Sequence, residues 1–127
     1  MRLHEYQARE ILRGYDTHVP RGITIFKAEE AEEAFLRLGQ PRAILKAQVL
    51  AGGRGKAGGI KIAHSPIEAR DLASRLLGSR LVTHQTTPEG EEVKAVLFQE
   101  LIPVEQEVYL AFIIDRQGAC PMLVACR

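Results

Sequence analysis

A glycine-rich segment near the middle of the sequence has the residue types that bind phosphate. Five glycines fall within the eight residues 52–59, and Arg54 and Lys56 stand among them. Glycine allows backbone N–H groups to point at a ligand because no Cβ is in the way, and the cations offset the charge of phosphate oxygens. The pattern favours a phosphate-binding loop over a flexible hairpin tip, since an ordinary tight turn needs only about one or two glycines.

The segments that flank this loop indicate which kind of phosphate loop it is. Residues 43–50 and 60–63 are apolar and strand-like, so the loop connects two predicted strands. The dinucleotide fingerprint requires a helix after the glycines, and the Walker A pattern requires Ser or Thr where this chain has Ala57. A glycine loop between two strands is instead typical of a flap that closes over a nucleotide, as in protein kinases and ATP-grasp enzymes. The loop alone does not separate these two classes.

Lys46 lies within the apolar run that precedes the loop, seven residues before Gly53. A lysine that is buried without a partner is costly, so we expect an anionic partner or a position at a cleft. The alternative is an exposed position on an edge strand. The position favours the cleft, because a strand that leads into the loop can direct the ammonium group at the same phosphates.

A third candidate region follows the strand-like run 93–98. It reads Phe98-Gln99-Glu100-Leu101-Ile102-Pro103 and is followed by Glu107. A strand that ends in polar residues and proline suits a hinge between two lobes, where backbone groups pair with the edge of a base and a carboxylate binds ribose hydroxyls. The alternative is an ordinary strand exit, and the pattern alone does not decide between them.

The helices and strands that the sequence predicts around these residues indicate an α+β fold, with short helices on one face of a mostly antiparallel sheet. Apolar residues at helical spacing predict helices over residues 3–15 and 31–38. A capping box at Ser65 followed by Pro66 predicts a third helix that ends before Gly78. Predicted strands cover residues 23–26, 43–50, 60–63, 93–98, 108–114 and 119–126. The last strand is followed by a single residue, which favours a chain that continues.

Composition limits the classes of function. The 127 residues are 46% apolar and 26% charged, as in an ordinary globular domain, and a net charge of +1 gives no overall field to attract nucleic acid or an anionic membrane. No apolar run approaches the roughly 20 residues that span a bilayer. We therefore expect no nucleic-acid or membrane partner, and a cytoplasmic or mitochondrial-matrix location. Cys120 and Cys126 are expected to be reduced strand residues, and the four histidines lack metal-ligand spacing.

Three segments together resemble the beta subunit of succinyl-CoA synthetase. They are Leu3-His4-Glu5-Tyr6-Gln7-Ala8, the run from Lys46 to Gly59, and Glu107-Val108-Tyr109-Leu110. The glycine run with its lysine is highly specific, the first segment is moderately so, and the last is weak by itself. The resemblance extends along most of the chain and implies the small lobe of an ATP-grasp fold. The implied parts are an N-terminal helix and linker (residues 1–20), the small lobe (21–100) and the start of the larger lobe (101–127).

The same resemblance implies a nucleotide site. The implied contacts are Lys46 and Gly53-Arg54-Gly55 at the phosphates, Gln99, Glu100 and Ile102 at the base, and Glu107 at the ribose. Members of that family often carry Glu at the position of Gln99. They join succinate to CoA with cleavage of ATP or GTP, through a phosphohistidine of a partner alpha subunit, so no histidine of this chain is expected to be catalytic. The Mg²⁺ ligands and the CoA-ligase domain are expected beyond Arg127, and this chain alone is not expected to catalyse the reaction.

Two other interpretations stay open at this point. A malate-CoA ligase or an ATP-citrate lyase shares the implied fold, and these residues do not exclude either. A structural lobe that mainly docks partner domains is the alternative from a different class.

Overall fold

A four-stranded antiparallel sheet forms the centre of the computed structural model, which describes residues 2–127. The strand order is β1-β6-β2-β3, with bounds β1 (Gly22–Ile25), β2 (Ala43–Ala47), β3 (Ile60–Ala63) and β6 (Val96–Glu100). Two further antiparallel pairs are β4 (Arg80–Leu81) with β5 (Glu91–Glu92), and β7 (Tyr109–Asp115) with β8 (Cys120–Cys126). The predicted antiparallel sheet is therefore confirmed.

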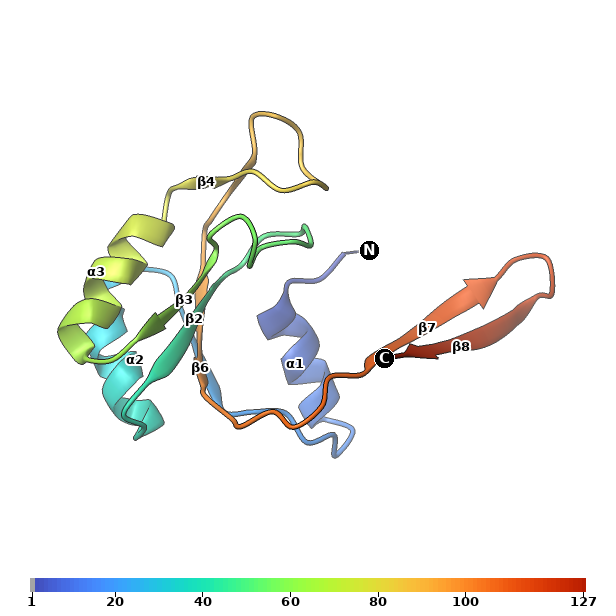
Figure 1. Cartoon of the computed structure of the whole chain (residues 1–127), viewed down its shortest axis with the longest axis horizontal. Helices are drawn as coiled ribbons and strands as arrows, with labels where there is room; N and C mark the ends of the chain where they lie inside the picture. The colour runs from blue at the N-terminus through green and yellow to red at the C-terminus, as the bar shows by residue number, and fades with distance from the viewer. Residues whose placement is uncertain (1) are drawn as a thin grey trace.

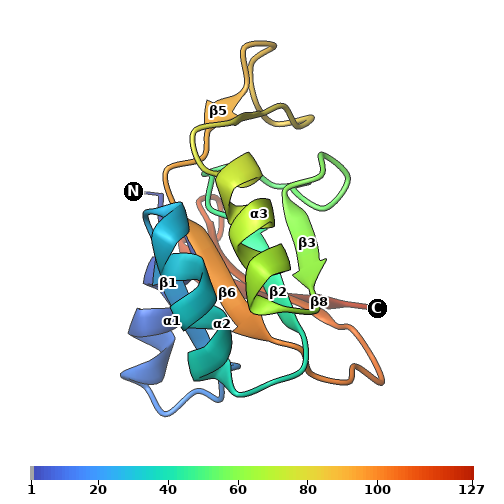
Figure 2. The same cartoon turned by 90° about the vertical axis from the view of Figure 1, so that its left-hand side faces the viewer.

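Two helices pack side by side on one face of this sheet (Figure 2). They are α2 (Ala31–Leu38), which follows the short 3-10 helix η1 (Ala28–Glu30), and α3 (Pro66–Leu76). Helix α3 begins where the capping box predicts, because the Ser65 hydroxyl accepts a hydrogen bond from the Glu68 amide at 3.1 Å. Helix α2 ends at Gly39, whose φ of 64° is left-handed and suits glycine. The apolar sides of both helices and of the strands form the core, which includes fully buried Phe98.

Helix α1 (Glu5–Arg13) lies across the opposite face of the sheet from α2 and α3 (Figure 1). Along β2, Leu45 and Ala47 are buried toward the core, so Lys46 between them points to the α1 face. Gln99 of β6 is paired with Ile44 of β2 and shares this face. The α+β class is confirmed, and α1 adds a helix on the second face of the sheet, which helical spacing alone does not reveal.

Several elements are shorter or shifted relative to the sequence prediction. Helix α1 covers residues 5–13 and not 3–15, because His4 is extended and Asp16 has a left-handed φ of 53°. Strand β6 begins at Val96 and not at Val93, because the Val93 backbone pairs with Gly78 and Ser79 instead of continuing the ladder with β2.

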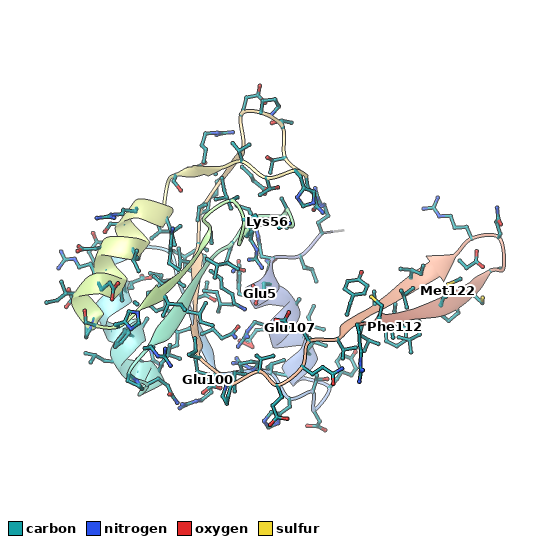
Figure 3. The ribbon with its side chains drawn as sticks, in the orientation of Figure 1. Glu5, Lys56, Glu100, Glu107, Phe112 and Met122 are labelled. Carbon is teal, nitrogen blue, oxygen red and sulfur yellow. The ribbon has the colours of Figure 1, made fainter. Side chains whose placement is uncertain are left out.

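The β7–β8 hairpin extends away from the sheet and its helices (Figure 1). The two strands pair in antiparallel register, yet both expose apolar side chains, among them Phe112 on β7 and Met122 on β8 (Figure 3). Cys120 and Cys126 lie on β8 as free thiols, as predicted. None of the helices described for residues 2–127 combines the length and apolar character that a membrane crossing demands.

Replacing Phe98 with Ala is expected to lower the free energy of unfolding by about 3 to 5 kcal/mol, because the buried ring leaves a cavity. Phe112→Ala is the matched control: it removes the same atoms from a ring that is 77% exposed, and the expected change is within about 0.5 kcal/mol. Urea unfolding of the three proteins measures both values. Equal losses at the two positions would contradict the core position of Phe98.

Candidate functional site

The glycine loop, residues 52–59, connects β2 to β3 and folds back on itself. The Ala57 amide donates to the Gly53 carbonyl at 3.2 Å, and the Gly59 amide donates to the Arg54 carbonyl at 2.8 Å. Gly53 and Gly58 have φ values of 77° and 78°, in the left-handed region where a side chain is strained. The glycines therefore allow a compact, hydrogen-bonded turn between the two strands.

A second loop packs against the glycine loop and limits the residue types it can hold. The Gly52 amide donates to Gln85 Oε1 at 2.7 Å, and a Cβ at Gly53 would lie 2.7 Å from the ring of His84. At Gly59, a Cβ would lie 2.7 Å from the side chain of Leu81. Sequence reasoning did not connect residues 81–85 with the loop, since no local pattern marks a contact between two loops.

Consecutive backbone amides at the tip of the loop are available to a ligand. Within residues 2–127, no hydrogen bond runs from the amides of residues 53–56 to another residue. Successive N–H groups in a turn form a concave surface that binds anions such as phosphate. The loop therefore has unengaged backbone donors, and phosphate binding at these amides stays a prediction.

Lys46 and Arg54 meet at the carboxylate of Glu5, which begins helix α1. Lys46 Nζ donates to Glu5 Oε1 at 2.9 Å, and Arg54 Nη2 donates to Glu5 Oε2 at 2.8 Å. The three side chains are mostly buried, with 19%, 19% and 24% of their surfaces exposed. Arg54 Nη1 also donates to the Ala47 carbonyl at 2.8 Å. Lys46 thus has an anionic partner, as the sequence predicts for a lysine within an apolar strand.

A second contact joins β6 to the cluster formed by Glu5, Lys46 and Arg54. Gln99 Oε1 accepts hydrogen bonds from Lys46 Nζ at 2.9 Å and from Arg9 Nη1 at 3.0 Å. Arg9 is buried and also donates to the Pro20 carbonyl. Burial lowers the pKa of Arg9, and the charge of Glu5 opposes that effect, but a guanidinium stays protonated in any case. Two cations thus bind the Glu5 carboxylate directly, and Arg9 lies nearby, where Glu5, Glu100 and Glu10 all act on its charge.

The protonation state of Glu5 follows from its surroundings. Partial burial acts to raise the pKa of the Glu5 carboxyl, but the hydrogen bonds and charges of Lys46 and Arg54 outweigh burial and leave the pKa below its ordinary value. Glu5 is therefore ionised at neutral pH. Sequence reasoning missed Glu5 and Arg9, although their spacing of four residues places both on one side of a helix.

The remaining candidate residues lie outside this cluster. Glu100 binds Arg21, accepting from its amide at 2.6 Å and from its Nε at 2.9 Å, and these two hydrogen bonds lower the pKa of Glu100. Ile102 and Glu107 are exposed on the segment between β6 and β7, and among the described residues neither side chain has a hydrogen bond to the cluster. Figure 3 shows Glu100, at the end of β6, apart from Glu107 on the segment that follows. Their contacts to a base or ribose stay predictions.

An open pocket of about 450 Å³ lies beside the cluster, between the start of α1 and the stem of the glycine loop. It is lined by Arg2, Leu3, Glu5, Val49, Leu50, Ala51 and Arg54. The pocket gives a ligand access to Arg54 from solvent. A polyanion in this pocket would meet the cationic side chains of Arg2 and Arg54, beside the carboxylate of Glu5.

Comparison with known proteins agrees with this chemistry. The model of the ATP-grasp domain family matches residues 2–127. The succinate–CoA ligase [ADP-forming] beta subunit of Geobacillus kaustophilus is 53% identical over 116 residues, which cover 91% of this chain and 30% of that protein. The corresponding subunit of Chloroherpeton thalassium is 48% identical over 128 residues, which cover 98% of this chain and 33% of that protein. The chain thus spans about a third of the length of these relatives.

Solved structures show the same fold in a more distant protein. Acetyl-coenzyme A synthetase 1 (dinucleotide forming) of Ca. Korarchaeum cryptofilum, in complex with coenzyme A, acetyl-coenzyme A and a phosphorylated phosphohistidine segment, superposes with a TM-score of 0.69. The match has 22% sequence identity and covers 98% of this chain and 51% of that one. At this identity the likeness concerns the fold. It agrees with the sheet and helix arrangement described above.

Replacing Glu5 with Gln is expected to lower the free energy of unfolding by roughly 1 to 3 kcal/mol at pH 7, because charge-assisted hydrogen bonds to two cations are weakened. Since the pKa of Glu5 is lowered on folding, this contribution is fully present above the ordinary value of 4.5 and is lost as the pH falls through the lower folded value. Urea unfolding from pH 7 to pH 3 measures the difference between the two proteins.

Glu10→Gln is the matched control, because Glu10 lies on the same helix with 70% of its side chain exposed. Its pair with Arg13 is a surface ion pair, for which little contribution is expected. A difference between the wild type and Glu5→Gln that persists unchanged at pH 3 would contradict the ion pairs of Glu5.

Proposed function

The chain belongs to the ATP-grasp family, and from this premise we propose that it is the nucleotide-binding N-terminal part of a succinate–CoA ligase beta subunit. One observation carries the proposal: Lys46 and Arg54 converge beside a loop whose amides at residues 53–56 are free to bind an anion. The family and the names of the relatives identify this anion as the phosphate groups of a nucleotide.

The charges of the cluster suit a polyphosphate. The charges of Lys46 and Arg54 are only partly offset by Glu5, and Gln99 accepts hydrogen bonds there without adding a negative charge. The excess positive charge attracts a nucleotide, and the free amides bind phosphate oxygens without a further side chain. Lys46 is held by β2 and Gln99 at one point of the sheet, so its ammonium group is positioned before the ligand arrives.

In the complete protein, we propose, ATP is cleaved to ADP while succinate and CoA are joined. The ADP-forming relatives support ATP over GTP and succinate over the malate or citrate of the alternative enzymes. The partner is an alpha subunit that supplies the phosphohistidine, and this chain by itself is inactive. The proposed location is the cytoplasm or a mitochondrial matrix.

Mg²⁺ accompanies the nucleotide in this proposal and offsets the charge of the phosphates. Among residues 2–127, no three His, Cys, Asp or Glu side chains are arranged to hold a metal ion. We propose, from the family resemblance, that the protein ligands of Mg²⁺ lie in the part of the protein that follows Arg127.

The proposed domain organisation divides the chain near β6. Residues 1–20 form the N-terminal helix and linker, residues 21–100 the small lobe, and residues 101–127 the start of the larger lobe. The extended β7–β8 hairpin supports this division, because an isolated two-stranded hairpin is at best marginally stable in water and requires a surface to cover its apolar side chains. In this proposal the hairpin becomes part of the larger lobe.

Lys46→Ala and Arg54→Ala are each expected to weaken ATP binding about tenfold or more, since each removes a charge-assisted contact to phosphate. Calorimetric titration of the chain with ATP measures the dissociation constants. Lys94→Ala is the matched control: it removes the same charge from a side chain that is 78% exposed, and binding is expected to stay within about twofold of the wild type. Unchanged binding in the first two variants would overturn the proposed phosphate site.

The acid substrate is tested in the complete protein with its alpha subunit. Formation of acyl-CoA from succinate, malate and citrate is compared at equal ATP concentration. The expected result is a kcat/KM for succinate that exceeds the other two by about a hundredfold, since the added hydroxyl of malate and the added hydroxyl and carboxylate of citrate would be buried without partners. A preference for malate or citrate would favour the alternative enzymes.

A further inference from the structure

Glu5 lies where the two cations of the proposed phosphate site converge. Each of its carboxylate oxygens accepts from a different cation, Oε1 from Lys46 and Oε2 from Arg54. A phosphate group would make the same two contacts through two of its own oxygens. A carboxylate in this position is therefore an equivalent of the ligand that the site is proposed to bind.

Some of the donors of both cations are already engaged, and these include the donors that face Glu5. Lys46 has three N–H donors, and two of them contact Glu5 and Gln99. Both terminal nitrogens of Arg54 donate as well, one to Glu5 and one to the carbonyl of Ala47. A phosphate that takes the donors now held by Glu5 on both cations must take the place of its carboxylate. A phosphate bound beside it would be repelled, since like charges in a partly buried site are weakly screened.

Helix α1 is attached to the sheet largely by hydrogen bonds, which can be replaced by hydrogen bonds to a ligand or to water. The Tyr6 amide donates to Gln48 Oε1 at 3.1 Å, and Arg9 donates to Gln99. Tyr6 packs edge-on against Phe26, with ring centroids 6.1 Å apart, whereas Ile11 and Leu12 are 50% and 43% exposed and contribute little buried surface. A helix with few buried apolar contacts opens at low cost in free energy.

We propose, resting on the nucleotide site proposed above, that Glu5 is an internal anion which occupies the phosphate position until nucleotide binds. Nucleotide replaces the carboxylate on Lys46 and Arg54, and helix α1 is released from the sheet. Glu5 thereby sets the affinity of the site and links the position of α1 to its occupancy. The free site keeps both cations ordered, because they remain paired with an anion in the absence of ligand.

The test uses the isosteric neutral variant Glu5→Gln, with Glu10→Gln as a control on the same helix. Titration calorimetry with ATP and with inorganic triphosphate gives the affinities. Glu5→Gln is expected to bind both about tenfold more tightly than the wild type, because the competing charge is gone. Glu10→Gln is expected to bind as the wild type does. Triphosphate separates the phosphate contacts from any contact to the base.

Hydrogen exchange of the unmodified chain provides a second readout that depends on no variant. Inorganic triphosphate is expected to raise the exchange rate of the amides of residues 5–13, because α1 loses its contact with the cations. Slower or unchanged exchange overturns the proposal.

Three affinity results would overturn it as well. If the Glu5→Gln variant has the affinity of the wild type, Glu5 does not compete with the ligand. If its affinity is lower, Glu5 orients the cations for the ligand. Binding in neither protein shows that removal of the internal anion creates no phosphate site. The nucleotide site itself fails on a different result, unchanged ATP binding in Lys46→Ala and Arg54→Ala.

Discussion

A lysine inside an apolar strand must be paired with an anion, and the functional face of this protein is organised by that constraint. Lys46 lies on β2 between two buried residues and has only 19% of its side chain exposed. Leaving such an ammonium group unpaired costs far more than ordering the groups that satisfy it. Glu5 and Gln99 meet this requirement from two different elements, and the position of α1 follows from it.

In the proposed phosphate site, the side chains around Lys46 favour a polyanion because their positive charge is incompletely neutralised. Arg9 and Arg54 add positive charge, and Glu5 supplies the single carboxylate in direct contact with Lys46 and Arg54. A second carboxylate at position 99 would bring the cluster closer to neutrality, whereas Gln99 accepts hydrogen bonds without adding charge. The remaining positive charge and the free amides of residues 53–56 together favour a polyanion over a simple carboxylate.

One face of the sheet stabilises the fold, and the other carries the proposed binding site. The face under α2 and α3 is apolar and contains Phe98 and Leu45, so its packing stabilises the fold without any ligand. The face under α1 contains buried Leu97 but also the polar side chains Lys46 and Gln99, whose hydrogen bonds can in this proposal be exchanged for contacts to a ligand. A change on the α1 face can therefore alter affinity while the core stays packed.

The sequence by itself determined the features that depend on neighbouring residues. Glycine content predicted the turn at residues 52–59, the capping box predicted the start of α3, and the apolar run around Lys46 predicted its need for an anion. These properties follow from local torsion angles, capping and solvation. Tertiary structure alone decided that Glu5, 41 residues away in the chain, is this anion and that Arg9 meets Gln99 across 90 residues. Such pairs form because packing places α1 on one face of the sheet, and local spacing contains no information about that choice.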